Sequence, residues 1–117
     1  MIRYGKYNNK KIIIDGIQFD SQKEGYRYKE LRLLQRAGLI KDLKLQVSYT
    51  LQPSFKSNGQ TIRSIKYIAD FDYFTTKDNR HILEDVKSPA TAKDKTYILK
   101  KKMLLYKYQD IEFKEII

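Results

Sequence analysis

Residues 83–87 read LEDVK, and residues 67–71 read YIADF. The apolar and aromatic residues in both runs favour β-strands, in which successive side chains point to opposite faces. Asp85 and Lys87 then share one face of their strand, while Glu84 points to the other. The pattern predicts a carboxylate and an ammonium group side by side on one face of a sheet.

A polar turn over residues 75–80 joins these two strands into a hairpin. Antiparallel pairing about this turn places Asp70 roughly opposite Asp85. Two carboxylates at such positions repel each other, and a divalent cation would compensate the repulsion and could polarise a phosphate. We therefore expect Asp70 and Asp85 to bind a metal, and Lys87 to orient the attacking water or neutralise the pentavalent phosphate.

Glu24 is expected to approach this site from a helix over about Ser21 to Ala37. Ser21 and Glu24 have the spacing of a capping box. Glu24, Tyr28 and Leu31 fall on one helical stripe, so Glu24 points toward the sheet if Leu31 packs on it. The cap and the metal-ligand role are alternatives that can coexist.

Other acids compete for the ligand roles. Asp72 shares the strand face of Asp70 and is its main rival. Glu84 competes with Asp85 only if the strand register slips by one residue. The single histidine, His81, has no acid or second histidine at ligand spacing, and we expect a turn residue there rather than a catalytic base.

The remaining pattern completes an α+β fold. An Asp-Gly pair between apolar β-formers predicts a hairpin over residues 11–19. Gln46 and Gln52 lie on the first long strand, from which a side chain could approach the metal site. The other expected elements are strands over Leu43–Phe55, Arg63–Phe74, His81–Lys87 and Ile111–Ile116, and a lysine-rich helix from Lys95 to about Tyr108.

Length and composition limit the classes of protein. A chain of 117 residues can bury one modest core, so we expect a single domain, 1–117, with 1–19 as an N-terminal hairpin extension. There are no cysteines, so oxygen ligands or His81 must hold any metal, which suits Mg²⁺ or Mn²⁺. The formal net charge of +10 favours a polyanionic partner.

A membrane role is not expected, because no apolar run has the roughly 18 residues needed to span a bilayer. The first residues also lack the apolar stretch of a signal peptide. We expect a cytoplasmic protein, located in the host-cell cytoplasm if a phage encodes it.

The combination of YIADF, a hairpin, LEDVK and a basic helix resembles the bipartite Asp…(Asp/Glu)-x-Lys signature of the PD-(D/E)XK nuclease superfamily. More narrowly, the chain resembles small phage and prophage proteins of the DUF1064 type over nearly all of its length. Residues 19–24 (FDSQKE) and 99–102 (LKKK) stand in the expected places. Ala69 departs from the proline in the superfamily name, at a position that tolerates substitution.

The resemblance implies a restriction-endonuclease-like αβββαβ core, in which two helices flank a central mixed sheet. It also implies Mg²⁺-dependent phosphodiester hydrolysis, with Asp70 and Asp85 as ligands, Lys87 as a catalytic residue and Glu24 as an accessory ligand and catalytic residue. The expected protein is a phage-type DNA endonuclease acting on duplex or branched DNA. A Holliday-junction resolvase, which is usually a homodimer, is one such form.

The run from Lys87 to Lys107 has seven lysines and one acid, which indicates a phosphate-facing surface beside the site. A solvated helix face is the alternative for these lysines. Two further functions stay open, namely a non-catalytic DNA-binding module with a nuclease-like fold and a basic protein that binds another protein. The expected DNA contacts are Lys93, Lys95, Lys100 and Lys101.

Overall fold

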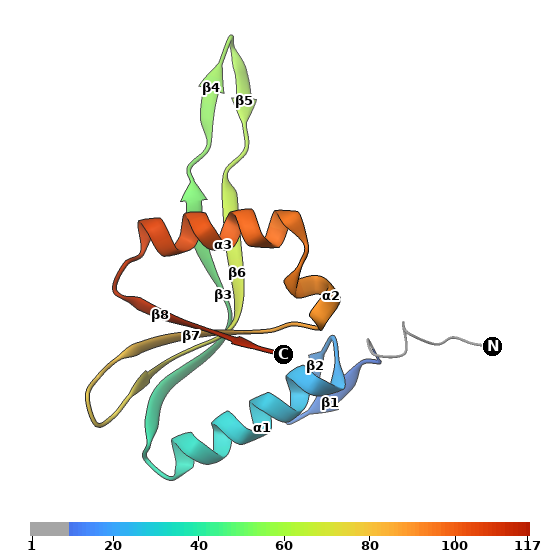
Figure 1. Ribbon diagram of the computed structural model, residues 1–117, viewed down its shortest axis with the longest axis vertical. Coiled ribbons are helices and arrows are strands. Elements are labelled where there is room, and N and C mark those ends of the chain that lie inside the picture. Colours follow the sequence, from blue (N-terminus) through green and yellow to red (C-terminus); the bar gives the residue numbers. More distant parts are fainter. Residues whose placement is uncertain (1–9) are drawn as a thin grey trace, which may run out of the picture.

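A four-stranded sheet organises the computed structural model, which describes residues 10–117 (Figure 1). Its strands are β3 (Ile40–Gln52), β6 (Ile65–Thr75), β7 (His81–Val86) and β8 (Ile111–Ile116), in the order β3-β6-β7-β8. Neighbours pair antiparallel except β7 and β8, which pair parallel. The fold is therefore α+β with a mixed central sheet, as predicted. Residues 1–9 of the predicted extension lie outside the described residues.

Three helices accompany the sheet: α1 (Gln22–Arg36), α2 (Pro89–Ala92) and α3 (Lys95–Lys107). The first and last lie within one residue of the predicted bounds. The short α2 was not predicted, although Ser88 caps it and Pro89 occupies its first turn, where a missing N–H has no cost. No helix in residues 10–117 is long and apolar enough to cross a membrane.

The N-terminal hairpin forms as predicted from β1 (Ile12–Ile14) and β2 (Ile17–Phe19). Asp15 and Gly16 form its turn with φ angles of 54° and 77°. The hairpin packs on α1 at Gly25, where an added Cβ would lie 2.7 Å from Ile12 Cγ2. The absence of a side chain at Gly25 allows this close approach directly beside Glu24.

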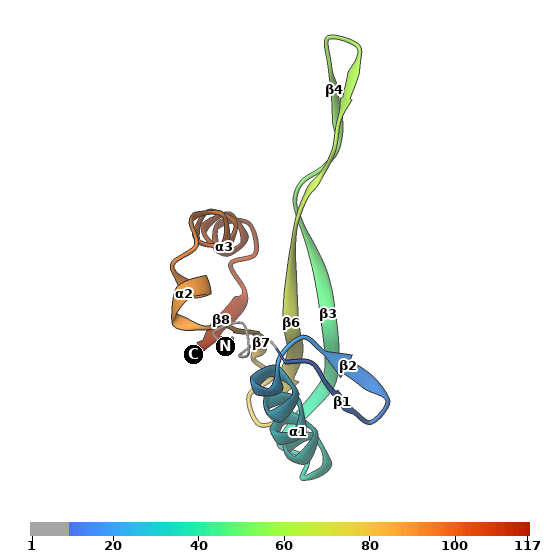
Figure 2. The same ribbon diagram turned by 90° about the vertical axis from the view of Figure 1, so that its right-hand side faces the viewer.

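A second hairpin, of β4 (Phe55–Ser57) and β5 (Gln60–Ile62), extends from the ends of β3 and β6 (Figures 1 and 2). The predicted strand over Leu43–Phe55 is wrong at its end, because the β3 ladder stops before Pro53. Proline has no N–H to donate to a ladder. We call residues 53–64 the arm.

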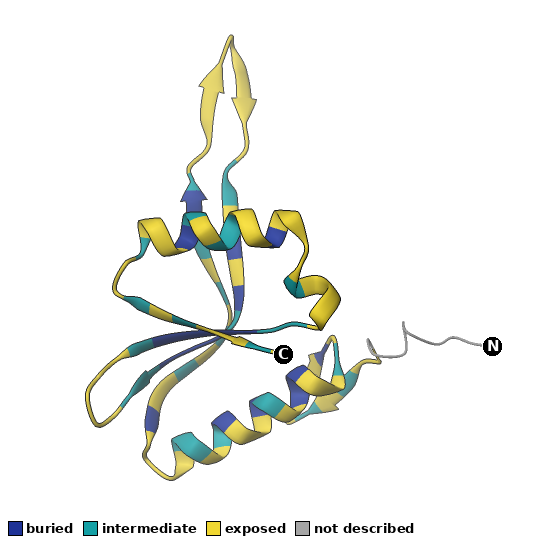
Figure 3. Ribbon diagram, in the orientation of Figure 1, coloured by how far each residue is buried: buried dark blue, intermediate teal, exposed yellow. Residues whose placement is uncertain are grey.

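The core consists of two clusters on opposite faces of β7. Ile82 belongs to the cluster that includes Leu31 of α1, and the next residue, Leu83, to the cluster that includes Leu104 of α3. Figure 3 shows the buried residues along the central strands and on the inner sides of both helices. The two clusters meet at the junction of β6 and β7, where the candidate site lies.

Strand β6 contributes residues to both clusters, although all of these residues have odd numbers and should lie on one face. Tyr67 and Ala69 pack in the α3 cluster, whereas Phe71 and Tyr73 pack in the α1 cluster. Regular alternation would keep all four on one face. The strand therefore changes its buried face at Asp70.

Candidate active site

Asp70 and Asp85 face each other across the β6–β7 hairpin. The last registered pair is Phe71 with Glu84, and the two aspartates occupy the next position along. The backbone N–H of Asp70 donates to Asp85 Oδ1 at 2.8 Å, and the N–H of Val86 donates to Asp70 Oδ2 at 2.9 Å. The predicted juxtaposition is confirmed, and these hydrogen bonds fix both carboxylates at the point where the strands separate.

Glu24 reaches the same place from the first turn of α1. Ser21 Oγ accepts the Glu24 N–H at 3.1 Å, so Ser21 caps the helix, which is one half of the predicted capping box. The Glu24 side chain instead lies beside Gln46, whose Nε2 donates to Glu24 Oε2 at 3.3 Å and to Asp70 Oδ1 at 3.2 Å. One amide group thus links the two acids.

Gln46 has an unusual backbone conformation for a strand residue. The φ angle of Gln46 is 53°, in the left-handed region. Leu45 and Val47 have paired partners on β6, whereas Gln46 between them has none. A non-glycine residue in this region is uncommon and carries a conformational cost, which is typical of functional sites. The conformation occurs opposite Asp70, where β6 changes its buried face.

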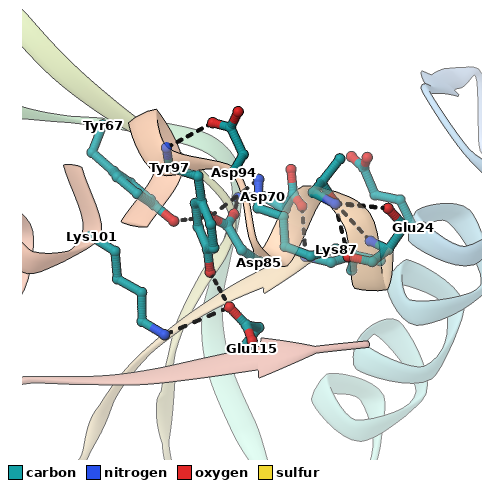
Figure 4. Close-up of polar contacts among 12 residues, drawn as sticks. Glu24, Tyr67, Asp70, Asp85, Lys87, Asp94, Tyr97, Lys101 and Glu115 are labelled. Carbon is teal, nitrogen blue, oxygen red and sulfur yellow. Dashed lines mark hydrogen bonds and ion pairs between the residues drawn. The ribbon is translucent and has the colours of Figure 1, made fainter. Parts of the chain in front are cut away.

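Lys87 follows β7 and lies next to the paired carboxylates (Figure 4). Its Nζ is 4.0 Å from Asp85 Oδ2 and 4.5 Å from the centre of the Tyr97 ring. Tyr67 donates its hydroxyl hydrogen to the same Asp85 oxygen. The structure therefore brings all four predicted residues, Glu24, Asp70, Asp85 and Lys87, to one site, and adds the tyrosines.

Burial and mutual repulsion make these acids hard to ionise. Burial, assisted by the negative charges of Asp70, Asp20 and Asp85, raises the pKa of Glu24 to about 7. Burial also raises the pKa of Asp85 to about 6, against the opposing hydrogen bond from Tyr67. The pKa of Asp70 is raised as well, again mainly by burial. A cation at this site would relieve both effects.

The donor chemistry of the site suits a hard divalent cation, because Glu24, Asp70 and Asp85 all present carboxylate oxygens. Their protein partners already engage one oxygen of Glu24 and both oxygens of each aspartate. Within residues 10–117, no three side chains of His, Cys, Asp or Glu are arranged as a ready metal cluster. These three acids could hold a metal, provided that some of their present hydrogen bonds are exchanged for it.

A cleft of about 740 Å³ opens beside Lys87, between the start of α1 and α2. Lys23 and Tyr26 of α1 line one side, and Ser88 and Thr91 line the other. The ammonium groups of Lys23 and Lys87 and the hydroxyl groups of Ser88 and Thr91 therefore lie on the walls of the cleft. The cleft gives a ligand access to the surroundings of Lys87.

The rival acids are bound to partners of their own. Asp72 accepts from the Tyr49 hydroxyl and lies 2.8 Å from His81 Nε2. Glu84 is fully buried on the other face of β7, where Arg27 donates to both of its oxygens at 2.7 Å. The register has not slipped, so Glu84 does not replace Asp85. The expectation of a turn residue without a neighbouring acid is wrong for His81, because His81 begins β7 and lies beside Asp72.

The predicted DNA-contacting lysines differ in their surroundings. Lys93 and Lys95 are exposed on either side of Asp94, the N-cap of α3, and Lys100 is half-buried. Lys101 lies 3.6 Å from Glu115 and 4.8 Å from the centre of the Phe113 ring. The ammonium group of Lys101 therefore already interacts with Glu115 and Phe113.

Sequence reasoning missed Tyr67 and Tyr97 as members of the site. Strand alternation puts Tyr67 and Asp70 on opposite faces, and nothing in the sequence marks the change of face between them. Tyr97 follows Asp94 by three residues, which is a cap signal and gives no sign of the contact with Lys87.

The fold and the site define a class: an α+β protein with a mixed sheet and paired carboxylates beside a lysine at the junction of two strands. Over residues 4–117 the chain matches the model of the family described as "Protein of unknown function (DUF1064)". The chain belongs to this family. No curated protein and no solved structure matches it.

Proposed function

We propose that this protein is a metal-dependent nuclease of the PD-(D/E)XK superfamily that hydrolyses phosphodiester bonds in DNA. The observation that carries the proposal is the fixed pair of Asp70 and Asp85, with Lys87 Nζ 4.0 Å from Asp85. The family match over residues 4–117 is consistent with it but names no activity.

Glu24, Asp70 and Asp85 would hold Mg²⁺ or Mn²⁺. When bound, such an ion neutralises the acids, polarises a phosphate oxygen and lowers the pKa of a bound water. The pKa of Glu24, raised to about 7 by burial and by the negative charges of neighbouring acids, supports a cation here, because a cation would stabilise the charged form.

The protein's own residues orient the reaction. Lys87 lies between the Asp85 carboxylate and the Tyr97 ring, from where its ammonium group can orient the attacking water and stabilise charge on the pentavalent phosphate. Tyr67 holds Asp85 in place by its hydrogen bond. Gln46 does the same for Glu24 and Asp70.

The net charge of +10 and the lysines next to the site support DNA as the substrate, either duplex or branched. A phage enzyme of recombination, replication or packaging, working as a homodimer in the host cytoplasm, fits this reading. A resolvase of four-way junctions is one form of it. The contacts proposed for DNA are Lys93, Lys95, Lys100 and Lys101.

A non-catalytic DNA-binding module is the second candidate. One observation favours it: the carboxylates already accept protein hydrogen bonds, and no three acids in the described chain surround a common point. The two candidates differ in one measurable property, the cleavage of DNA.

The test incubates the protein with supercoiled plasmid, linear duplex and a four-way junction, each with Mg²⁺, Mn²⁺ or EDTA. The nuclease proposal predicts cleavage that needs the cation and is lost in Asp70→Asn and Asp85→Asn. DNA binding without cleavage under any of these conditions would favour the second candidate. Cleavage at an unchanged rate in either variant would overturn the site assignment.

A further inference from the structure

The arm is a two-stranded hairpin without a buried core of its own. Its turn residues Asn58 and Gly59 have φ angles of 51° and 77°, which suits a tight hairpin turn. Every residue of its two strands is exposed. Figures 1 and 2 show it extending past α3 and away from the rest of the molecule. An isolated two-stranded hairpin is marginally stable, so the arm adds little to the fold.

The charged residues of the arm are all positive. From Leu43 to Ala69 the sequence contains no acid, although the whole chain has 14. The same stretch carries four cations, of which Lys56 and Arg63 belong to the arm. Such a segment attracts a polyanion and is repelled by a second copy of a chain with net charge +10.

The two faces of the arm differ in chemistry. Phe55 pairs with Ile62, and Ser57 pairs with Gln60, on one face. Lys56 pairs with Thr61 on the other. A two-stranded ribbon fits the major groove of B-form DNA, which is about 12 Å wide, and its cations can contact the phosphates on the rims.

We propose that the arm inserts into the major groove of duplex DNA next to the cleavage site, with Lys56 and Arg63 on the phosphates and the polar tip toward the base edges. This inference builds on the proposed function, since it takes DNA as the substrate. It adds a separate binding surface that none of the predicted contacts includes.

The strands relate the arm to the site. Gly59 at the tip of the arm and Asp70 are eleven residues apart on one continuous segment, which spans at most roughly 36 Å at about 3.3 Å per residue. B-form DNA rises about 3.4 Å per base pair, so the arm meets the duplex within about eleven base pairs of the cut phosphate. Binding therefore requires duplex on one side of the site.

The test compares Lys56→Gln/Arg63→Gln with a control of equal charge change, Arg36→Gln/Lys77→Gln. The control residues are exposed and lie just beyond the Ile40–Thr75 pair, at the end of the β3–β6 ladder opposite the arm. Binding to a duplex of about 30 base pairs is measured by fluorescence anisotropy in EDTA over a range of salt concentrations. The absence of divalent cation separates binding from cleavage.

The arm variant is expected to bind on the order of tenfold more weakly, with a salt slope lower by one to two units, while the control keeps wild-type affinity. An RNA duplex of the same sequence should show no difference between the two variants, because its major groove is too narrow for the ribbon. Equal effects in both variants, or no effect in the arm variant, would overturn the inference.

Two further outcomes keep this inference apart from the nuclease proposal. Loss of DNA affinity in the arm variant of a protein that never cuts DNA would support the arm and refute the nuclease. A change in sedimentation of the arm variant, with unchanged DNA affinity, would show that the arm binds a second copy and would overturn the inference.

Discussion

Asp85 is a structural acceptor for Asp70, because its Oδ1 takes the Asp70 backbone N–H at 2.8 Å where the strands separate. Removing the carboxylate by Asp85→Ala would leave this N–H and the Tyr67 hydroxyl without an acceptor. An unsatisfied buried donor costs about 1–3 kcal/mol.

We therefore expect Asp85→Ala to lose cleavage and stability together, whereas Asp85→Asn loses cleavage and keeps most of the stability. Urea unfolding and plasmid cleavage of the two variants test this expectation. Equal stability of the two variants would show that the hydrogen bonds to Asp85 are of little importance for the fold.

Lys87 should act on the reaction rather than on binding. Lys87→Ala removes the only cation placed by the structure within 4.0 Å of Asp85 among the described residues, and we expect the rate at saturating DNA to fall by about 10²–10³-fold. DNA affinity should stay near the wild-type value, since one phosphate contact contributes little. Single-turnover cleavage and anisotropy measure the two effects, with Lys77→Gln as the control. A loss of affinity at an unchanged rate would mean that Lys87 merely binds DNA.

The acids make the metal-free protein less stable as pH rises. The pKa of Glu24 is about 7 in the folded state against 4.5 for the free group, so the full stability is present below about pH 4.5 and is lost as pH rises to 7. Asp85, with a pKa of about 6, acts in the same direction.

We expect the unfolding free energy in EDTA to fall by about 3 kcal/mol over this range relative to Glu24→Gln, which lacks the Glu24 contribution. Mg²⁺ at pH 8 should restore stability, because it binds only the folded state. Urea titrations at several pH values measure both effects. Parallel pH profiles for the wild type and Glu24→Gln would contradict the burial of a charged Glu24.

The lysines of the α2–α3 region should differ from one another. Lys93→Gln/Lys95→Gln removes two exposed cations and is expected to lower the salt slope of DNA binding by one to two units. Lys101→Gln should have a smaller effect, because its ammonium group lies 3.6 Å from Glu115. An unchanged slope in the double variant would show that these lysines form a solvated face.

The pair of Arg27 and Glu84 should matter for folding and not for cleavage. Arg27→Met leaves the fully buried Glu84 without its cation, which typically costs about 3–5 kcal/mol. Arg27→Met/Glu84→Leu should recover much of this loss. Denaturation measures the stabilities, and cleavage by the folded double variant should proceed at nearly the wild-type rate. Loss of cleavage in the folded double variant would show that Glu84 or Arg27 belongs to the active site.

The sequence was sufficient for the parts of the site that depend on regular geometry. The period of two along strands and the short turn at 75–80 determine that Asp70 meets Asp85. The stripe of Glu24, Tyr28 and Leu31 is buried as predicted. The same register argument would also have found His81 beside Asp72, since Phe74 pairs with His81 two residues along the strand.

Other features depend on three-dimensional shape that no local pattern encodes. The left-handed backbone of Gln46 has no sequence signal, because glutamine is not favoured there. The change of face in β6, which brings Tyr67 to Asp85, is visible only once one end of the strand packs in the α3 cluster and the other in the α1 cluster. Pro53 ends the ladder inside the predicted strand 43–55, because proline has no N–H to donate.

Arg27 and Glu24 lie three residues apart on α1. The bidentate hydrogen bond from Arg27 to Glu84 therefore also fixes the rotation of α1 about its own axis. A rotation of α1 that withdrew Glu24 from Gln46 would have to break that charged pair inside the core. The helix is therefore locked against turning and cannot serve as a lid. A ligand must enter past Lys23 and Tyr26 without displacing α1, and relaxation dispersion should find this helix free of microsecond-to-millisecond exchange.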